Sequence, residues 1–428
     1  MSAQLVCHML RATTRIAALY LSAAWCQFAA AQTIGPAIQE PDDVAGRRVI
    51  PEYAPIGYDL HGFDVLPSVT FGAKSDNNIF TRSSLERSDI SFVAEPRLRI
   101  KRKGRQSNIA AEASARATNY ARFNDQDSTE YRFEGTYTLG TGDANFVSTN
   151  LGYRREAVLR GTAEYDLPAG EPLIRRVLHG SVTGHIRLNR LSLDAQILAA
   201  RQSYEDVRIA GQARLSQDFR NVKRHGLHAL ASYEMSGRTS FFTNLEYDQF
   251  NYNSSPLIED RDANSWSATA GVKYELNRIF YAQLGIGYRQ YDFREPTLGA
   301  IKGIAVSGHL RYFPSRLLAI RALVEQSNTT SPYDFVGAVT LTTARIETEY
   351  EMRRSLSWLG AVKFTLEDYA KQPYSARRIE ATGGPRLRFN RWLSADATLG
   401  FARRFVNGVA PFEPYSQFYG MISVTVSR

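Results

Sequence analysis

The histidines are the first residues in this sequence that could do chemistry. Beyond residue 31 they are His61, His179, His185, His225, His228 and His309. A Ser-His-acid arrangement is defined by its geometry, so residues scattered along a sequence do not establish one. His225 and His228 lack a further ligand at a spacing typical of metal sites. The sequence therefore predicts no enzyme, no metal site and no cofactor.

Cysteine chemistry is confined to the first 31 residues, which have the features of a secretory signal peptide. A basic start and an apolar run precede Ala29–Ala31, which match the A-x-A cleavage rule. Both cysteines, Cys7 and Cys26, lie in this segment. We expect the mature protein to have no thiol nucleophile and no disulfide.

Arginine dominates the basic residues. The chain has 52 Lys and Arg against 43 Asp and Glu, and only 8 of the 52 are Lys. Arginine is suited to fixed, bidentate contacts with carboxylate, phosphate or sulfate. No nucleic-acid-binding module is present, and an exported chain seldom meets nucleic acid, so we expect no such partner.

Many charged residues recur at every second position along segments whose other positions are apolar. In residues 91–101, for example, Phe92 and Leu98 alternate with Glu95 and Arg97. We expect the charged face to line a water-filled lumen, and one hypothesis is that its Arg clusters hold or steer an anionic solute. The alternative is that the charges neutralise one another in pairs and brace the wall. The predicted lining residues are Glu95, Arg97, Arg99, Lys101, Arg132, Glu134, His185, Arg187, Lys273, Glu275, His309, Arg311, Arg345, Glu347, Glu349, Glu351, Arg386 and Arg388.

The elements that must position these residues are long strands, because alternation with a period of two indicates strands between an apolar and a polar medium. We expect eighteen, beginning near residues 62, 88, 106, 129, 144, 176, 191, 222, 238, 262, 279, 300, 315, 336, 356, 376, 392 and 415. Very short turns alternate with long polar loops, and the phrase Leu188-Asn189-Arg190 returns at 276–278 and, with Phe first, at 389–391. Short turns at one end and long loops at the other are typical of outer-membrane barrels.

The predicted fold class is therefore all-β: a single transmembrane antiparallel up-and-down β-barrel of about eighteen strands. Sixteen strands is the alternative, because residues 144–175 are the least regular. The expected organisation is a signal peptide at 1–31, an extended periplasmic or plug segment at 32–60 and the barrel at 61–428. An even strand number places both termini at the periplasmic side, where aromatic residues such as Tyr137 and Tyr233 precede the turns.

The segment that leads into the barrel resembles the opening of the β-barrel porin 2 family of Gram-negative outer membranes. The resemblance lies in residues 49–57 (VIPEYAPIG), 63–69 (FDVLPSV) and 76–80 (DNNIF), and it continues through the Leu-Asn-Arg turns. It implies an outer-membrane barrel, often encoded beside exopolysaccharide or capsule machinery, and no catalytic residues. One departure is the end of the chain in Ser427-Arg428, where such barrels usually carry an aromatic residue.

The expected function is a porin-like channel for small polar or anionic solutes in the cell outer membrane. The alternatives are a conduit for export of exopolysaccharide or capsule and a structural barrel with a closed lumen. The expected partners are outer-membrane lipid, lipopolysaccharide and the barrel-insertion machinery, with periplasmic polysaccharide-export components under the second alternative. Residues 32–60 either plug the lumen, dock on a periplasmic partner or form a tether, and the sequence does not specify the oligomeric state.

Overall fold

The computed structural model describes residues 43–140, 145–168, 170–209, 214–253 and 260–428. The predicted signal peptide and residues 32–42 of the predicted plug segment lie outside the described residues. No helix in the described part of the chain is long and apolar enough to span a membrane.

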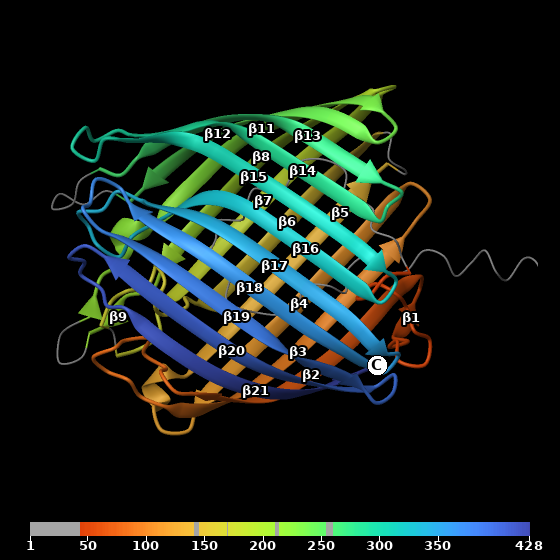
Figure 1. Cartoon of the computed structure of the whole chain (residues 1–428), viewed down its shortest axis with the longest axis horizontal. Coiled ribbons are helices and arrows are strands. Elements are labelled where there is room, and N and C mark those ends of the chain that lie inside the picture. The colour runs from red at the N-terminus through yellow and green to blue at the C-terminus, as the bar shows by residue number, and fades with distance from the viewer. Residues whose placement is uncertain (1–42, 141–144, 169, 210–213, 254–259) are drawn as a thin grey trace, which may run out of the picture.

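Eighteen of the described strands pair in chain order, each antiparallel to the next, and the last pairs with the first to close a barrel (Figure 1). A short strand, β1 (Tyr58–Leu60), pairs with the start of the first barrel strand, and β9 (Val207–Arg208) pairs with β10 (Arg214–Leu215) in a loop. The barrel strands are β2 (Phe63–Asp76), β3 (Asp89–Lys103), β4 (Ser107–Tyr120), β5 (Ser128–Leu139), β6 (Asn145–Ala157), β7 (Ile174–Leu188), β8 (Leu191–Tyr204), β11 (Val222–Ser236), β12 (Thr239–Tyr252), β13 (Ala263–Leu276), β14 (Phe280–Phe293), β15 (Ala300–Ser315), β16 (Leu318–Thr329), β17 (Val339–Arg353), β18 (Leu356–Tyr369), β19 (Ser375–Arg388), β20 (Leu393–Asn407) and β21 (Tyr415–Ser427).

The predicted eighteen-stranded barrel is confirmed, and the sixteen-stranded alternative is wrong. Every predicted strand start lies within three residues of an observed one; the largest differences are at Leu318 and Val339, predicted near 315 and 336. The irregular region that suggested fewer strands contains β6, the start of β7 and a long connection between them. Strands of 12 to 16 residues exceed the length that a tilted strand needs to cross a bilayer.

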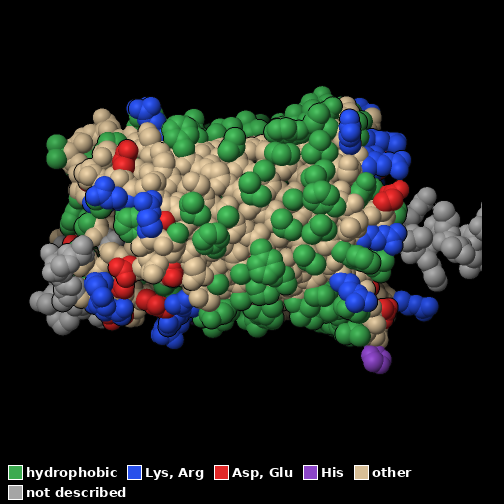
Figure 2. Space-filling view, turned by 90° about the horizontal axis from the view of Figure 1, so that it is seen from below, with side chains coloured by type: hydrophobic (Ala, Val, Ile, Leu, Met, Phe, Trp, Pro, Cys, Tyr) green, Lys and Arg blue, Asp and Glu red, His purple; other side chains and the backbone are tan. Residues whose placement is uncertain are grey.

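The outer surface of the barrel is an apolar band. Large side chains at alternate strand positions are exposed, as at Ile197 (64%), Leu284 (68%) and Leu399 (75%). Figure 2 shows this band on one face, with charged side chains gathered toward both ends of the barrel. The aromatic residues that precede the short turns are also exposed, as at Tyr137 and Tyr233. This distribution matches hydrocarbon flanked by two interfaces.

Asparagine closes three of the short turns, and it does so in two ways. Asn189 and Asn277 have φ of 57° and 50°, a left-handed conformation that asparagine tolerates better than most residues. In the third copy of the phrase, the side chain of Asn390 instead accepts hydrogen bonds from the backbone N–H groups of Trp392 and Leu393, at 2.8 and 2.9 Å. The repeated phrase therefore closes hairpins by backbone conformation or by side-chain capping.

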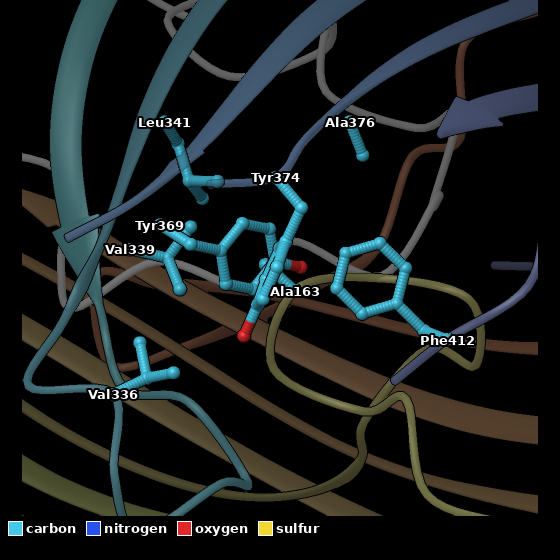
Figure 3. Packing of buried hydrophobic residues seen from close by; sticks show 8 residues of the cluster. All are labelled: Ala163, Val336, Val339, Leu341, Tyr369, Tyr374, Ala376 and Phe412. Atoms are coloured by element: carbon cyan, nitrogen blue, oxygen red, sulfur yellow. The ribbon is translucent and has the colours of Figure 1, made fainter. Parts of the chain in front are cut away.

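The long loops at the other end pack together and contribute to the largest apolar cluster of the described residues. Tyr369, Tyr374 and Phe412 come from β18, from the loop after it and from the loop before β21, and their ring centroids lie 5.0 to 5.6 Å apart (Figure 3). Ala163, from the loop between β6 and β7, packs in the same cluster. The barrel thus has a small core at one end, where loops meet.

Candidate functional site in the barrel interior

The inward face of each strand is identified by contacts that join opposite walls. Arg175 on β7 and Arg404 on β20 belong to distant strands, yet both bind the loop between β6 and β7. Their side chains therefore point into the barrel. Because side chains alternate along a strand, the inward positions of every other strand follow from the pairing registers.

All eighteen predicted lining residues lie at these inward positions. The structure brings several of them into ion pairs, both along one strand and between neighbouring strands. The pairs that involve predicted residues are Arg97 with Glu95 and Glu112, Arg99 with Glu112, Arg132 with Glu134, His185 with Asp194, Arg187 with Glu234, Arg345 with Glu347, Arg386 with Asp396, Arg388 with Glu349, and Glu351 with Arg48. Lys273 instead donates to Ser232 Oγ at 2.9 Å. Much of the predicted charge is thus arranged in pairs.

One group of basic residues on the inward face shares a carboxylate. The guanidinium groups of Arg132 and Arg154 both lie 3.9 Å from the carboxylate of Glu134, and His179 Nε2 lies 3.3 Å from it. Arg132 and Arg154 are directly opposite on β5 and β6. The Arg132 side chain is 54% exposed, so it is accessible from the lumen. We call these four residues the shared-carboxylate cluster.

Two further arginines face each other on the opposite wall of the barrel. Arg311 on β15 and Arg321 on β16 are directly opposite in the register. Like charges at opposite positions of a sheet repel each other, so a sequence retains them where a further group offsets the repulsion. Arg321 is also opposite Glu347 on its other side. The wall thus carries arginine pairs on both sides of the lumen.

The outer end of the lumen contains the loop between β6 and β7, residues 158–168 and 170–173, which we call the inserted loop. Its Asp166 accepts two hydrogen bonds from Arg404, and Arg404 also binds Glu367 and donates to the Tyr369 hydroxyl at 2.8 Å. The side chains of Asp166, Arg404 and Glu367 are at most 2% exposed. This charge network fixes the loop to β18 and β20.

A second network holds the same loop to the opposite wall. Glu164 accepts hydrogen bonds of 2.9 and 3.0 Å from Arg175 on β7 and a further one from the Tyr204 hydroxyl on β8. Arg220 donates to the Glu164 carbonyl oxygen at 2.7 Å, and its guanidinium lies 4.0 Å from the ring of Tyr204. The inserted loop therefore spans the lumen between two walls.

Apolar and steric contacts complete the position of the inserted loop. Tyr165, Leu167 and Leu173 are buried in a cluster with Tyr204. Gly161 has φ of 68°, and a Cβ added there would lie 2.4 Å from the Tyr415 ring. Only glycine combines that conformation with so close an approach.

At the periplasmic end, residues 43–57 cross the mouth of the barrel before β1, and we call them the N-terminal strap. Val44 and Ala45 are buried against Phe313 and Ala319 at the ends of β15 and β16. Arg48 forms an ion pair with Glu351 on β17.

Beyond Arg48 the strap is held by polar contacts at the surface. Arg391 Nε donates to the Pro51 carbonyl oxygen at 2.9 Å, and Glu52 lies 3.5 Å from Arg354. The strap thus connects the wall near β17 with the wall near β2.

Two buried histidines have acidic neighbours. His185 Nδ1 lies 2.7 Å from Asp194, and His228 Nε2 lies 3.3 Å from Asp248, which also binds Arg224. In the described part of the chain, no group of three or more His, Cys, Asp or Glu side chains is arranged to hold a metal ion.

Sequence reasoning missed the residues that fix the inserted loop: Glu164, Asp166, Arg175, Tyr204, Arg220, Glu367, Tyr369 and Arg404. One signal was available. The loop is rich in apolar residues, among them Val158, Tyr165, Leu167 and Leu173, which a loop in solvent has little reason to carry. The wall residues that bind the loop lie up to 238 positions away in the sequence, as Arg404 does from Asp166, and no local pattern reveals them.

A closed barrel with an apolar outer band, a charged interior and a loop folded into the lumen defines the class of porin-like outer-membrane β-barrels. Residues 50–428 match the family model described as "Putative beta-barrel porin 2", so the chain belongs to that family. This confirms the resemblance seen in the sequence. No curated protein matches the sequence significantly.

Several solved structures of outer-membrane proteins from Pseudomonas aeruginosa are similar in outline. OccK2 (OpdF) has 9% identity and a TM-score of 0.46, covering 85% of this chain and 98% of its own. The outer membrane protein OpdK has 12% identity and a TM-score of 0.45, with 85% and 99% covered. The ferric enterobactin receptor PfeA has 10% identity and a TM-score of 0.41, with 85% and 80% covered. Likeness at this level carries no information about solutes.

Proposed function

We propose that this barrel is a passive, non-enzymatic channel for small polar solutes and that it favours anions. The observation that carries the proposal is the shared-carboxylate cluster, in which Arg132, Arg154 and His179 surround the single carboxylate of Glu134. Two guanidinium groups share this carboxylate, and Glu156, the other acidic group that acts on Arg154, is itself paired with Arg175. A carboxylate, phosphate or sulfate on a passing solute fits such a place.

The rest of the wall supports a hydrated lumen. Polar and charged side chains occupy many inward positions of the described strands, and several are only partly buried, as with Arg132 and Arg187. Arg311 and Arg321 face each other on the far wall, where Glu347 is opposite Arg321 on its other side. Rings of charge in a water-filled pore select ions by sign.

The test is the reversal potential of the purified, refolded protein in a planar bilayer under a salt gradient. We expect the unmodified protein to prefer anions and the R132Q/R154Q variant to shift toward cations. The matched control is R132K/R154K, which keeps both charges but lacks the guanidinium fork. It should keep the anion preference. A small dicarboxylate added to the solution should block the current through this control less than the current through the unmodified protein.

Two results would overturn the proposal. A cation preference in the unmodified protein would contradict the role of the arginines directly. An unchanged reversal potential in R132Q/R154Q would show that the cluster is only structural. Silence in both proteins would favour a structural barrel with a closed lumen.

A conduit for exported polysaccharide is a second candidate, and one observation favours it. Both ends of the lumen carry a segment that lies across it, the inserted loop at the outer end and the N-terminal strap at the periplasmic end. A conduit for a polymer must be closed when it is empty. Loss of surface polysaccharide on deletion of the gene, with little change in uptake of small solutes, would favour this role.

The outer membrane of a Gram-negative bacterium is the location that fits both roles, reached by export under the predicted signal peptide at residues 1–31. N-terminal sequencing of the protein from isolated outer membranes tests this. We expect Gln32 as the first residue.

A further inference from the structure

The outward face of the barrel carries an unexplained basic cluster near the loop end of three neighbouring strands. Arg176 on β7, Arg201 on β8 and Lys223 on β11 are exposed, and each lies within four residues of the strand end that joins the long loops. His225 lies one outward position further along β11. We call these four residues the rim cluster.

The outward direction of the rim cluster follows from its neighbours on the same strand faces. Leu178, Ile197 and Leu227 share faces with Arg176, Arg201 and Lys223, and they are 50%, 64% and 58% exposed. These three lie in the apolar band. The rim cluster is therefore on the membrane side of the wall, at the edge of the band and away from the lumen.

Two members of the cluster face each other directly. Arg201 is opposite Lys223 in the register between β8 and β11. Like charges at directly opposite positions destabilise a sheet, and the effect grows where hydrocarbon lowers the local dielectric. Nothing in the fold requires two cations at these positions.

The described acidic side chains do not relieve this repulsion. Glu205 lies 2.6 Å from Arg176 and 3.3 Å from Arg155, so its charge is already shared. Asp194 and Asp248 lie at inward positions and bind His185 and Arg224. Within the described residues, no ion pair joins an acidic side chain to Arg201 or Lys223.

We propose that the rim cluster binds the phosphate groups of a phosphorylated lipid in the outer leaflet of the outer membrane, the chemistry that lipopolysaccharide carries. A phosphate between Arg201 and Lys223 offsets their repulsion and accepts charge-assisted hydrogen bonds from both. Leu178 is directly opposite Arg201, and Ile197 and Leu227 lie four positions further from the loop end. These exposed side chains provide the surface for its acyl chains. This combination of charge above an apolar face selects an amphiphile over a free anion.

The leaflet follows from the topology. The rim cluster is at the end of the barrel with the long loops, and both the strap and the end of β21 are at the opposite end. In outer-membrane barrels the long loops are extracellular. A lipid bound here is therefore in the outer leaflet.

The experiment uses native mass spectrometry in detergent to measure binding of bisphosphorylated lipid A to the full mature protein and to two variants. The test variant is R201Q/K223Q. The matched control is R190Q/R238Q, which removes the same charge from exposed turn residues of the same hairpins at the opposite rim. We expect the test variant to bind lipid A at least about tenfold more weakly than the unmodified protein, because charge-assisted hydrogen bonds contribute that factor to the affinity. The control should bind like the unmodified protein.

A second variant keeps the proposal testable if R201Q/K223Q folds poorly. In Lys223→Glu a carboxylate faces Arg201, so the repulsion is relieved without a lipid. We expect this variant to unfold at a higher temperature than the unmodified protein in lipid-free detergent. Addition of lipid A should raise the unfolding temperature of the unmodified protein and leave that of K223E unchanged.

Three outcomes would overturn the proposal. The first is equal binding of lipid A by R201Q/K223Q and the control variant. The second is equal binding of lipid A and its dephosphorylated form by the unmodified protein. The third is complete displacement of lipid A by millimolar inorganic phosphate, which would show a site for a free anion and no lipid site.

Discussion

The two ends of the lumen are held by segments of different kinds. At the outer end, the inserted loop is fixed by ion pairs whose side chains are almost fully buried: Asp166 and Arg404 are 2% and 1% exposed. At the periplasmic end, the strap is held partly by the pair of Arg354 and Glu52, which are 74% and 58% exposed. Solvent screens exposed pairs, whereas a buried pair that loses a partner leaves a charge without compensation.

This difference indicates where the barrel is rigid and where it can open. The outer loop is held by charge on two walls and by an apolar cluster, so its release requires several interactions to break together. The strap has a small apolar contact at Val44 and Ala45 and one partly buried ion pair at Arg48. We expect opening to begin at the periplasmic end.

The largest effect is expected from Arg404→Gln. The change leaves Asp166 buried without its cation and leaves Glu367 with only Arg378, at 4.0 Å, which costs about 3–5 kcal/mol for a broken buried pair. We expect a lower unfolding temperature, measured by heat-dependent gel mobility, and a higher single-channel conductance as the inserted loop is released. Arg403→Gln is the control, because Arg403 is exposed and lies over the Phe405 ring. If both variants behave alike, the outer end is not fixed by buried charge.

A smaller effect is expected from Gly161→Ala. The new methyl group would meet the Tyr415 ring, and the alanine would have to adopt a left-handed backbone conformation. Together these cost about 1–3 kcal/mol. Faster hydrogen exchange in the inserted loop is the expected result. Gly237→Ala is the matched control, because a Cβ there has no neighbour within 4 Å and its turn lies at the other end. Equal exchange in the two variants would contradict a tightly fitted loop.

At the periplasmic end, Arg48→Gln should cost only about 1 kcal/mol, since the Arg48 side chain is 31% exposed while Glu351 is buried. We expect faster proteolysis within residues 43–57 and an unchanged unfolding temperature of the barrel. Arg354→Gln should leave proteolysis unaltered, because its ion pair is exposed. A loss of barrel stability in R48Q as large as that in R404Q would abolish the contrast between the two ends.

The smallest effect concerns pH at the outer loops. Partial burial raises the pKa of Glu413, but hydrogen bonds from Ser84 and Ser83 and the charge of Arg82 outweigh it, so the net pKa is lowered. A carboxyl whose pKa is lower in the folded state stabilises the fold above its ordinary pKa and loses that effect as the pH falls through the lowered value. We expect the Ser84 amide to lose protection in acid, relative to its intrinsic exchange rate at each pH, by about 0.5 kcal/mol. Glu413→Gln should remove this pH dependence, and its persistence in E413Q would assign it to another group.

Much of the wall could be predicted from alternation alone. The faces of β3 and β17 were assigned correctly from the sequence, because one medium is hydrocarbon and the other is polar, and each second side chain must suit its medium. The turns could also be predicted, since the repeated phrase with a central asparagine marks tight hairpins. The same reasoning can predict the pairing of Glu95 with Arg97, because both side chains are on one face of one strand.

The contacts that fix the two ends could not be predicted in this way. Asp166 and Arg404 are 238 residues apart, and Arg48 and Glu351 are 303 apart. No periodicity links such positions, because their proximity depends on closure of the barrel and on the path of the loops across it. The same holds for Arg132 and Arg154, whose opposition depends on the register between β5 and β6.

The sequence by itself determined where the strands begin, the two faces of the wall and the ends at which turns and loops lie. These follow from local rules: a period of two, the length needed to cross a bilayer and the residues that tight turns require. Only the tertiary structure decided that the loop between β6 and β7 enters the lumen, that the strap crosses the periplasmic mouth and that Arg201 faces Lys223. Closure of the sheet brings these distant positions together, and their charges then interact in places from which water is largely excluded.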